Sequence, residues 1–144
     1  MPFEFLMSAL LMSQAAAAQN PVAGNHGNSP AYRVFLNDLQ NAIRTNRREQ
    51  VLRLIAYPLR VNVYAGHRNT SRTRYYRTPV AVRLAYAQIF NSRVRAAILN
   101  QRYETLFAPS SGIMIGNGEV WFNGICLDRH CASFRVRIVS INIM

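Results

Sequence analysis

The residues best suited to bind a ligand form a basic segment between positions 66 and 77. It combines four arginines with two adjacent tyrosines: Arg68, Arg72, Arg74, Arg77, Tyr75 and Tyr76. The planar guanidinium group matches phosphate and carboxylate groups, and tyrosine rings stack on bases or sugars. The segment is therefore the candidate anion-binding site, and we expect it to form a polar connection between regular elements.

The charge of the whole chain leaves three interpretations of this segment open. All seventeen basic residues are arginine, six residues are acidic, and the formal net charge is +11. The first interpretation is a solvated basic face, since net charge alone does not specify function. The second is binding of anionic envelope polymers or an acidic protein, and the third is binding of nucleic acid. The export expected below disfavours nucleic acid, and the lack of lysine indicates a codon preference.

Acidic side chains offer little for catalysis. Glu119 is the only acid embedded in an apolar strand pattern, and Asp38 falls on the polar side of an amphipathic helix. The alternatives for Glu119 are a carboxylate that points into a cavity and one that begins a strand with its head in water. The histidines neighbour no nucleophile or carboxylate in a recognisable pattern. We therefore expect a non-enzymatic protein without cofactor or metal, with an isomerase or hydratase that uses Glu119 or Asp38 as the alternative.

Aromatic side chains suggest a candidate pocket. Tyr57, Tyr86 and Trp121 fall on apolar faces or at the ends of predicted elements, and Glu119 lies two residues before the tryptophan. Together these four residues are the candidate lining of a small apolar pocket. The alternative is ordinary core packing, in which each polar tip finds one partner.

The two cysteines, Cys126 and Cys131, flank a short polar stretch. Such a pair predicts a disulfide that joins the two sides of a loop. A metal site that uses both cysteines and His130 is the alternative, but it lacks a fourth ligand. No metal site is therefore expected.

Local sequence patterns predict several helices. Apolar residues recur at helical spacing after Ser29-Pro30, and a shorter helix is predicted from Asn46 to the Tyr57-Pro58 pair. Thr78-Pro79 and Asn91-Ser92 each predict the start of a further helix, because Thr and Asn are favoured N-caps.

Strands are predicted where apolar and polar side chains alternate along the chain. Residues 59–64 and 134–138 alternate between apolar and polar side chains, and a short strand is predicted at 105–108. Asn117-Gly118 between two apolar runs predicts a tight hairpin with positive φ at both residues. The predicted fold class is α+β, with N-terminal helices packed on a strongly curved antiparallel sheet.

Several motifs carry a resemblance to a known superfamily. They are Phe35-x-x-x-Leu39, Leu52-x-x-Leu-Ile-x-Tyr-Pro-Leu59, Ile89-Phe90, Gly112-Ile-Met-Ile-Gly-Asn-Gly-Glu-Val-Trp-Phe122 and Ile138-Val-Ser-Ile-Asn142. With the order of elements, they resemble the nuclear transport factor 2-like superfamily, in particular small exported bacterial members of unassigned function. The resemblance covers residues 30–144 and implies a cystatin-like cone, in which helices close the mouth of a bent sheet. Members include both enzymes and non-catalytic binders, so the site must decide the function.

The N-terminal residues predict export. An apolar run ends in Ala15-Ala16-Ala17-Ala18, which matches the pattern cleaved by signal peptidase, although no basic residue precedes it. The predicted organisation is a signal peptide at 1–18, a flexible lead-in at 19–29 and one domain at 30–144. We thus expect a periplasmic or secreted bacterial protein with no transmembrane span after cleavage. Its partner would be a small apolar ligand or an anionic envelope component, and a homodimer stays open.

Overall fold

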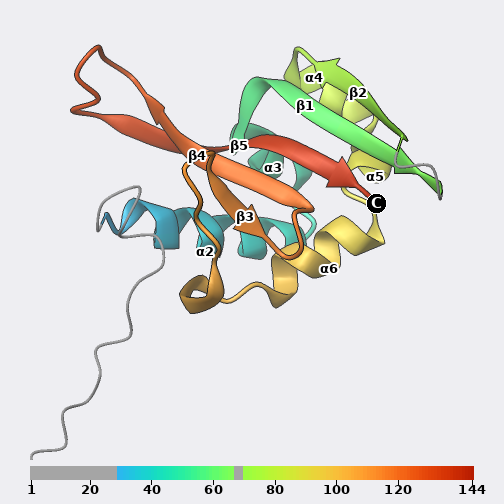
Figure 1. The fold of residues 1–144 in the computed structure, drawn as a ribbon, viewed down its shortest axis with the longest axis horizontal. Helices are drawn as coiled ribbons and strands as arrows, with labels where there is room; N and C mark the ends of the chain where they lie inside the picture. The colour runs from blue at the N-terminus through green and yellow to red at the C-terminus, as the bar shows by residue number, and fades with distance from the viewer. Residues whose placement is uncertain (1–28, 67–69) are drawn as a thin grey trace, which may run out of the picture.

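The computed structural model describes residues 29–66 and 70–144, so the predicted signal peptide and the lead-in up to residue 28 lie outside the described residues. The chain forms one layer of helices against one face of a sheet (Figure 1). In chain order the elements are α2 (Ala31–Arg44), α3 (Arg48–Arg53), β1 (Ile55–Ala65), β2 (Thr70–Tyr76), α4 (Pro79–Leu84), α5 (Tyr86–Ile89), α6 (Ser92–Asn100), η2 (Tyr103–Thr105), β3 (Ile113–Ile115), β4 (Val120–Cys126) and β5 (Phe134–Ile143). The predicted α+β class is confirmed at this level.

Helix α2 buries the apolar face that its spacing predicts. The side chains on this face are Tyr32, Phe35, Leu36, Leu39, Ala42 and Ile43. The starts predicted at Thr78 and Asn91 are confirmed, because Ala81 N donates to Thr78 Oγ1 at 3.2 Å and Val94 N donates to Asn91 Oδ1 at 2.9 Å. These caps satisfy backbone donors that the first helical turn leaves unpaired, and so fix where α4 and α6 begin. Helix α3 begins at Arg48, two residues after the predicted start at Asn46, and has no side-chain cap.

The sheet differs from the predicted antiparallel one. Its five strands have the order β2-β1-β5-β4-β3, and β1 pairs with β5 in parallel while the other pairs are antiparallel. The sheet is therefore mixed. The reason is that β5, the last strand in the chain, lies between β1 and β4 and runs in the direction of β1.

Several local predictions are wrong. The helix predicted to reach Tyr57-Pro58 ends at Arg53, and these two residues lie in β1. Residues 70–76 form strand β2 and not an irregular connection, because they pair along their whole length with β1. Residues 105–108 form no strand of their own: η2 ends at Thr105, and Phe107 makes only an isolated bridge to Met114. The sequence does not indicate the strand at 70–76, because its side chains are nearly all exposed and give no apolar alternation.

The core lies between the helices and the inner face of the sheet. Val61, Phe122, Ile138 and Ile141 are at most 1% exposed and point toward the helices. Residues of the opposite parity, such as Asn62 and Trp121, point to the outer face. This alternation, a direct result of the period of two in a strand, gives the sheet two chemically different faces.

Candidate functional site

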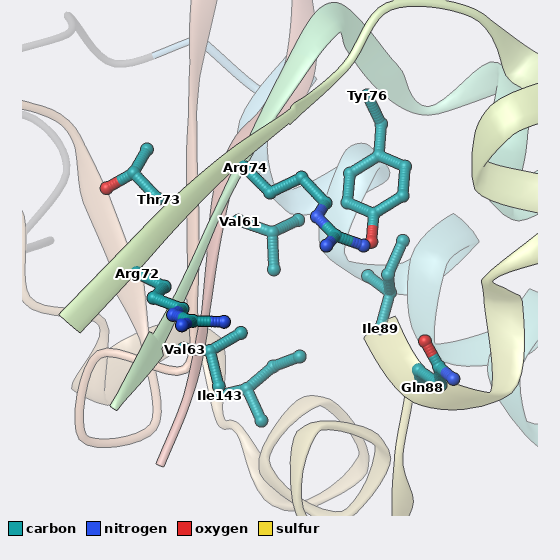
Figure 2. Close-up of a pocket in the computed structure, with 9 residues that line it drawn as sticks. All are labelled: Val61, Val63, Arg72, Thr73, Arg74, Tyr76, Gln88, Ile89 and Ile143. Atoms are coloured by element: carbon teal, nitrogen blue, oxygen red, sulfur yellow. The ribbon is translucent and has the colours of Figure 1, made fainter. Parts of the chain in front are cut away.

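A cleft opens where the inner face of the sheet passes from β1 to β2, beside α5. It has a volume of about 520 Å³ and is lined by Val61, Val63, Arg72, Thr73, Arg74, Tyr76, Gln88, Ile89 and Ile143. Figure 2 shows the guanidinium groups of Arg72 and Arg74 directed into the cleft, with Tyr76 beside Arg74 and Thr73 turned away. The cleft therefore combines an apolar floor with two cationic groups at its β2 side.

The register of the first hairpin explains why these side chains meet. Arg72 pairs with Val63 and Arg74 with Val61 across β1 and β2. Residues directly opposite each other in a pair of strands point to the same face. The two arginines thus stand beside the two valines that form the floor, and the helices that cover the rest of this face leave β2 exposed.

The described acids lie elsewhere. Glu49 forms an ion pair with Arg83 at 2.6 Å, and this bonded guanidinium holds the pKa of Glu49 below its usual value. The other ion pairs of the described residues join Glu104 to Arg33 and Glu119 to Arg93. None of the ion pairs in residues 29–66 and 70–144 uses Arg72 or Arg74. Their guanidinium groups are therefore not occupied by a carboxylate of the described chain.

The other two arginines of the candidate anion-binding segment are not part of the cleft lining. Arg77 follows the end of β2 and is exposed, and it does not line the cleft. Arg68 lies outside the described residues. The structure brings together Arg72 and Arg74 and adds Tyr76 to them.

The two tyrosines of the candidate aromatic pocket belong to the packing of the protein: Tyr86 lies in the core, and Tyr57 packs against it partly buried. The Tyr57 hydroxyl donates a hydrogen bond of 2.9 Å to the carbonyl oxygen of Leu52, and burial raises the pKa of Tyr57 to about 12. Tyr86 is 4% exposed and stacks on Phe90 with 4.9 Å between ring centroids. Burial also raises the pKa of Tyr86. Neither lines the cleft beside β2.

Trp121 and Glu119 lie at two further places. Trp121 lies on the outer face of the sheet and lines a groove there, whereas Glu119 lines a separate hollow next to α6. Asp38 lines a third hollow, between α2 and α3. The structure thus distributes the residues of the candidate pocket over several sites and does not bring Glu119 near Asp38.

Glu119 belongs to the turn that joins β3 to β4. Strand pairing stops at Ile115 and Val120, so the connection has four residues, and positive φ occurs at Gly116 and Gly118 instead of at Asn117. The predicted hairpin and the positive φ at Gly118 are therefore confirmed, but the two-residue turn and the positive φ at Asn117 are wrong. The carboxylate, 5% exposed, accepts a hydrogen bond of 2.6 Å from Asn117 N and lies 3.8 Å from Arg93 Nε. These two partners, one in the same turn and one on α6, stabilise the charge of the buried carboxylate.

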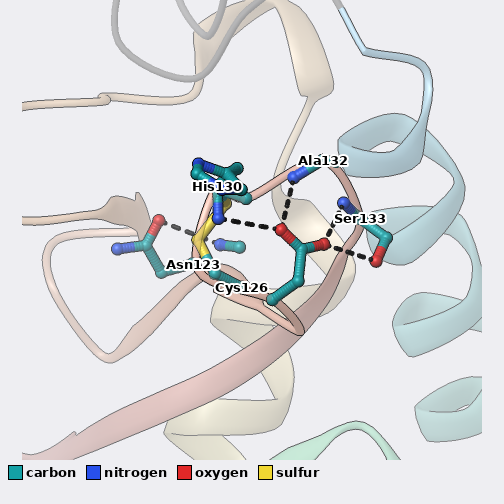
Figure 3. Close-up of a disulfide and its surroundings, with 8 residues drawn as sticks. Asn123, Cys126, His130, Ala132 and Ser133 are labelled. Atoms are coloured by element: carbon teal, nitrogen blue, oxygen red, sulfur yellow. Dashed lines mark hydrogen bonds between the residues drawn. A yellow bond between two sulfur atoms is a disulfide. The ribbon is translucent and has the colours of Figure 1, made fainter.

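The predicted disulfide between Cys126 and Cys131 is confirmed and closes the loop between β4 and β5 (Figure 3). Inside this loop the Asp128 carboxylate accepts hydrogen bonds from the backbone N–H groups of His130, Ala132 and Ser133, at 2.9 to 3.1 Å. Hydrogen bonds from Ala132 and Ser133 lower the pKa of Asp128 most. The loop is therefore organised around one carboxylate.

Neither metal-binding geometry nor similarity to known proteins indicates the function of the described residues. In the two described ranges, no three His, Cys, Asp or Glu side chains gather as they would around a metal ion. No described helix has the length and apolar character needed to cross a membrane. The chain matches no protein-family model, no curated protein and no solved structure.

Proposed function

We propose that the protein is an exported, non-enzymatic binding domain that takes an anionic amphiphile in the cleft beside β2. The observation that carries this proposal is the pair Arg72 and Arg74, directed over an apolar floor and not paired with an acid of the described chain. An apolar cavity with a few placed polar groups is the usual form of a small-molecule site, and about 520 Å³ is within its usual range. The ligand would place an acyl or similar chain on the valines and a carboxylate or phosphate against the arginines.

Two further features support export and membership of the superfamily that the sequence resembles. The disulfide fits an oxidising compartment, such as the periplasm or the exterior of a cell. The order of N-terminal helices, strand, further helices and a final run of strands, on which the resemblance to the nuclear transport factor 2-like superfamily rests, is present, with β2 as an added strand. Membership of that superfamily, with its cone-shaped sheet, is part of the proposal.

Isothermal titration calorimetry with decanoate and with decan-1-ol tests the ligand class. Both probes have the same chain length, but only decanoate carries a charge. A hydrogen bond to a charged group contributes about 1.5–3 kcal/mol, so decanoate should bind at least about tenfold more tightly than the alcohol. Protein recovered from the periplasm should also have the intact mass of a chain that begins at Gln19, less two hydrogens for the disulfide. This measurement checks export and oxidation together.

A double substitution, Arg72→Gln with Arg74→Gln, should remove the preference for decanoate and weaken its binding about tenfold or more. The matched control is Arg102→Gln with Arg129→Gln, which removes the same charge at exposed positions outside the cleft. It should leave the affinity within about twofold. Equal losses in both double variants would contradict the site. Retention on heparin that depends on Arg72 and Arg74, without any binding of decanoate, would overturn the amphiphile and favour an anionic polymer.

A further inference from the structure

The outer face of the sheet carries a second groove, on the side opposite to the Arg72 cleft. Its volume is about 420 Å³, and it is lined by Arg60, Asn62, Tyr64, Ser111, Trp121, Val139, Ser140 and Asn142. These residues come from β1, β4 and β5 and from the loop before β3. None of them lines the cleft beside β2, so the groove is an independent feature.

Amide side chains form a fixed row along the floor of this groove. Thr73 Oγ1 donates to Asn62 Oδ1 at 2.8 Å, and Asn62 Nδ2 donates to Asn142 Oδ1 at 2.8 Å. Asn142 Nδ2 in turn donates to the carbonyl oxygen of Gly118 at 2.6 Å. Each amide nitrogen has two N–H groups, so both asparagines keep one donor beyond this row. The row orients these donors before any ligand arrives, which lowers the entropic cost of binding.

Trp121 forms a platform at one side of the row. A Cβ atom at Gly112 would lie 3.6 Å from Trp121 Cε3, and one at Gly118 would lie 3.7 Å from Trp121 Nε1. The indole therefore packs against two backbone positions that lack side chains and is only partly exposed. Tyr64, 41% exposed, stands on β1 within the same groove. The groove thus presents aromatic surface next to oriented amide and hydroxyl groups.

Charge argues against a second copy of the chain as the occupant. Arg60 is on this face, and the β4–β5 register places Arg135 and Arg137 on it as well, opposite Ile125 and Asn123. The acids in the described ranges lie on the helices, in η2, in the β3–β4 turn and in the disulfide loop, not on this face. A symmetric dimer would therefore bring like charges together, which costs affinity.

We infer that this groove binds a pyranose ring of a saccharide. A pyranose has an apolar face of C–H groups, which fits the indole of Trp121, and a rim of hydroxyl groups that both donate and accept hydrogen bonds. The second amide N–H groups of Asn62 and Asn142, which donate to no acceptor within residues 29–66 and 70–144, complement that rim together with the Ser140 hydroxyl. The ligand class is thus a glycan, and the site is separate from the amphiphile cleft on the other face.

Fluorescence gives a direct test, because Trp121 is the only tryptophan of the chain. Cellotetraose and chitotetraose, two neutral β-1,4-linked saccharides, are titrated against the native protein. The expected result is a saturable change in the emission of Trp121 for at least one of them. No change up to about 10 mM of either saccharide would overturn the inference, since weaker binding than that corresponds to less than about 3 kcal/mol.

Two tyrosine variants locate the site. Tyr64→Ala removes aromatic surface inside the groove and should weaken binding about fivefold. Tyr75→Ala is the control: this tyrosine lies on the same face and is 55% exposed but does not line the groove, so its loss should change affinity less than twofold. Equal effects of the two substitutions would contradict the placement of the site. Concentration-dependent dimerisation that Tyr64→Ala abolishes would instead assign the face to a second copy.

The variant Arg72→Gln with Arg74→Gln separates this inference from the proposed function. It should abolish the preference for decanoate and leave the response of Trp121 to saccharide unchanged. Loss of both activities in this variant would show that the groove depends on the other face and would overturn an independent saccharide site.

Discussion

The two faces of the sheet use the same strands for opposite purposes. On β4, Phe122 points inward and is fully buried against Phe35, with 4.7 Å between ring centroids, whereas its neighbour Trp121 points outward and is partly exposed. On β1, the buried Val61 is followed by Asn62, which joins a row of polar side chains. The inner face therefore stabilises the fold by apolar burial, and the outer face is free to carry polar groups in fixed positions. The cleft beside β2 arises where the helical cover of the inner face ends.

The largest expected difference between the faces is at Trp121 and Phe122. Phe122→Ala should lower the free energy of unfolding by about 3–5 kcal/mol, because it empties a fully buried site. Trp121→Ala should cost less than about 2 kcal/mol, since the outer face can be rehydrated. Urea denaturation followed by circular dichroism measures both values. Equal losses would mean that Trp121 contributes as much to the core as Phe122 does, which would contradict the difference between the two faces.

A smaller effect is expected from the polar row. Asn62 is 8% exposed and bonds to Thr73, Asn142 and Arg60, so Asn62→Ala leaves buried polar partners unsatisfied. The expected loss is about 1–3 kcal/mol in the free energy of unfolding. Asn123→Ala, also on the outer face, is the control, because within the described part of the chain the Asn123 side chain makes one hydrogen bond, a local one that it accepts from Gly124 N. A loss at Asn123 that matches the loss at Asn62 would remove any special role of the row.

The smallest expected effect lies at the β4–β5 loop, beyond the helical layer. The lowered pKa of Asp128 means that its stabilising effect is complete above the usual aspartate value of 3.8 and is lost as the pH falls through the folded-state pKa. Asp128→Asn should lower the melting temperature by a few degrees at about pH 7 and much less at about pH 2. Thermal unfolding of both proteins at the two pH values measures the change. A difference that stays constant with pH would contradict the role of the ionised carboxylate.

Local signals in the sequence predicted much of the helical layer. The apolar spacing of α2 and the caps Thr78 and Asn91 are properties of short stretches, so they can be recognised without the fold. Strand β2 has no buried face and therefore no apolar period, although its Thr and Tyr residues have the β propensity that favours a strand. The parallel pairing of β1 with β5 joins distant parts of the chain and has no local signal. The sheet topology could not be predicted for that reason.

The candidate site, too, is predictable only where its residues lie close together in the sequence. The arginines between positions 66 and 77 stand out by type and spacing, but their neighbours Ile89 and Ile143 come from α5 and β5 and could be identified only from the fold. The disulfide was predictable because its two cysteines are close in sequence. The row from Thr73 through Asn62 to Asn142 crosses three strands, and single asparagines in the sequence do not indicate that they will meet.

The central position of β5 makes this strand the link between the two halves of the sheet. Without β5, the strand pairs of the described sheet would be two separate hairpins, β1–β2 and β3–β4, and β1 and β4 would each present an open edge. Unpaired edges of this kind favour pairing with other chains. Closure depends on residues such as Ile141 reaching Val61 on one side and Val120 on the other, and such distant contacts form slowly. The described sheet thus depends on β5 for its closure, and a chain in which β5 is unpaired exposes two strand edges that favour association with other chains.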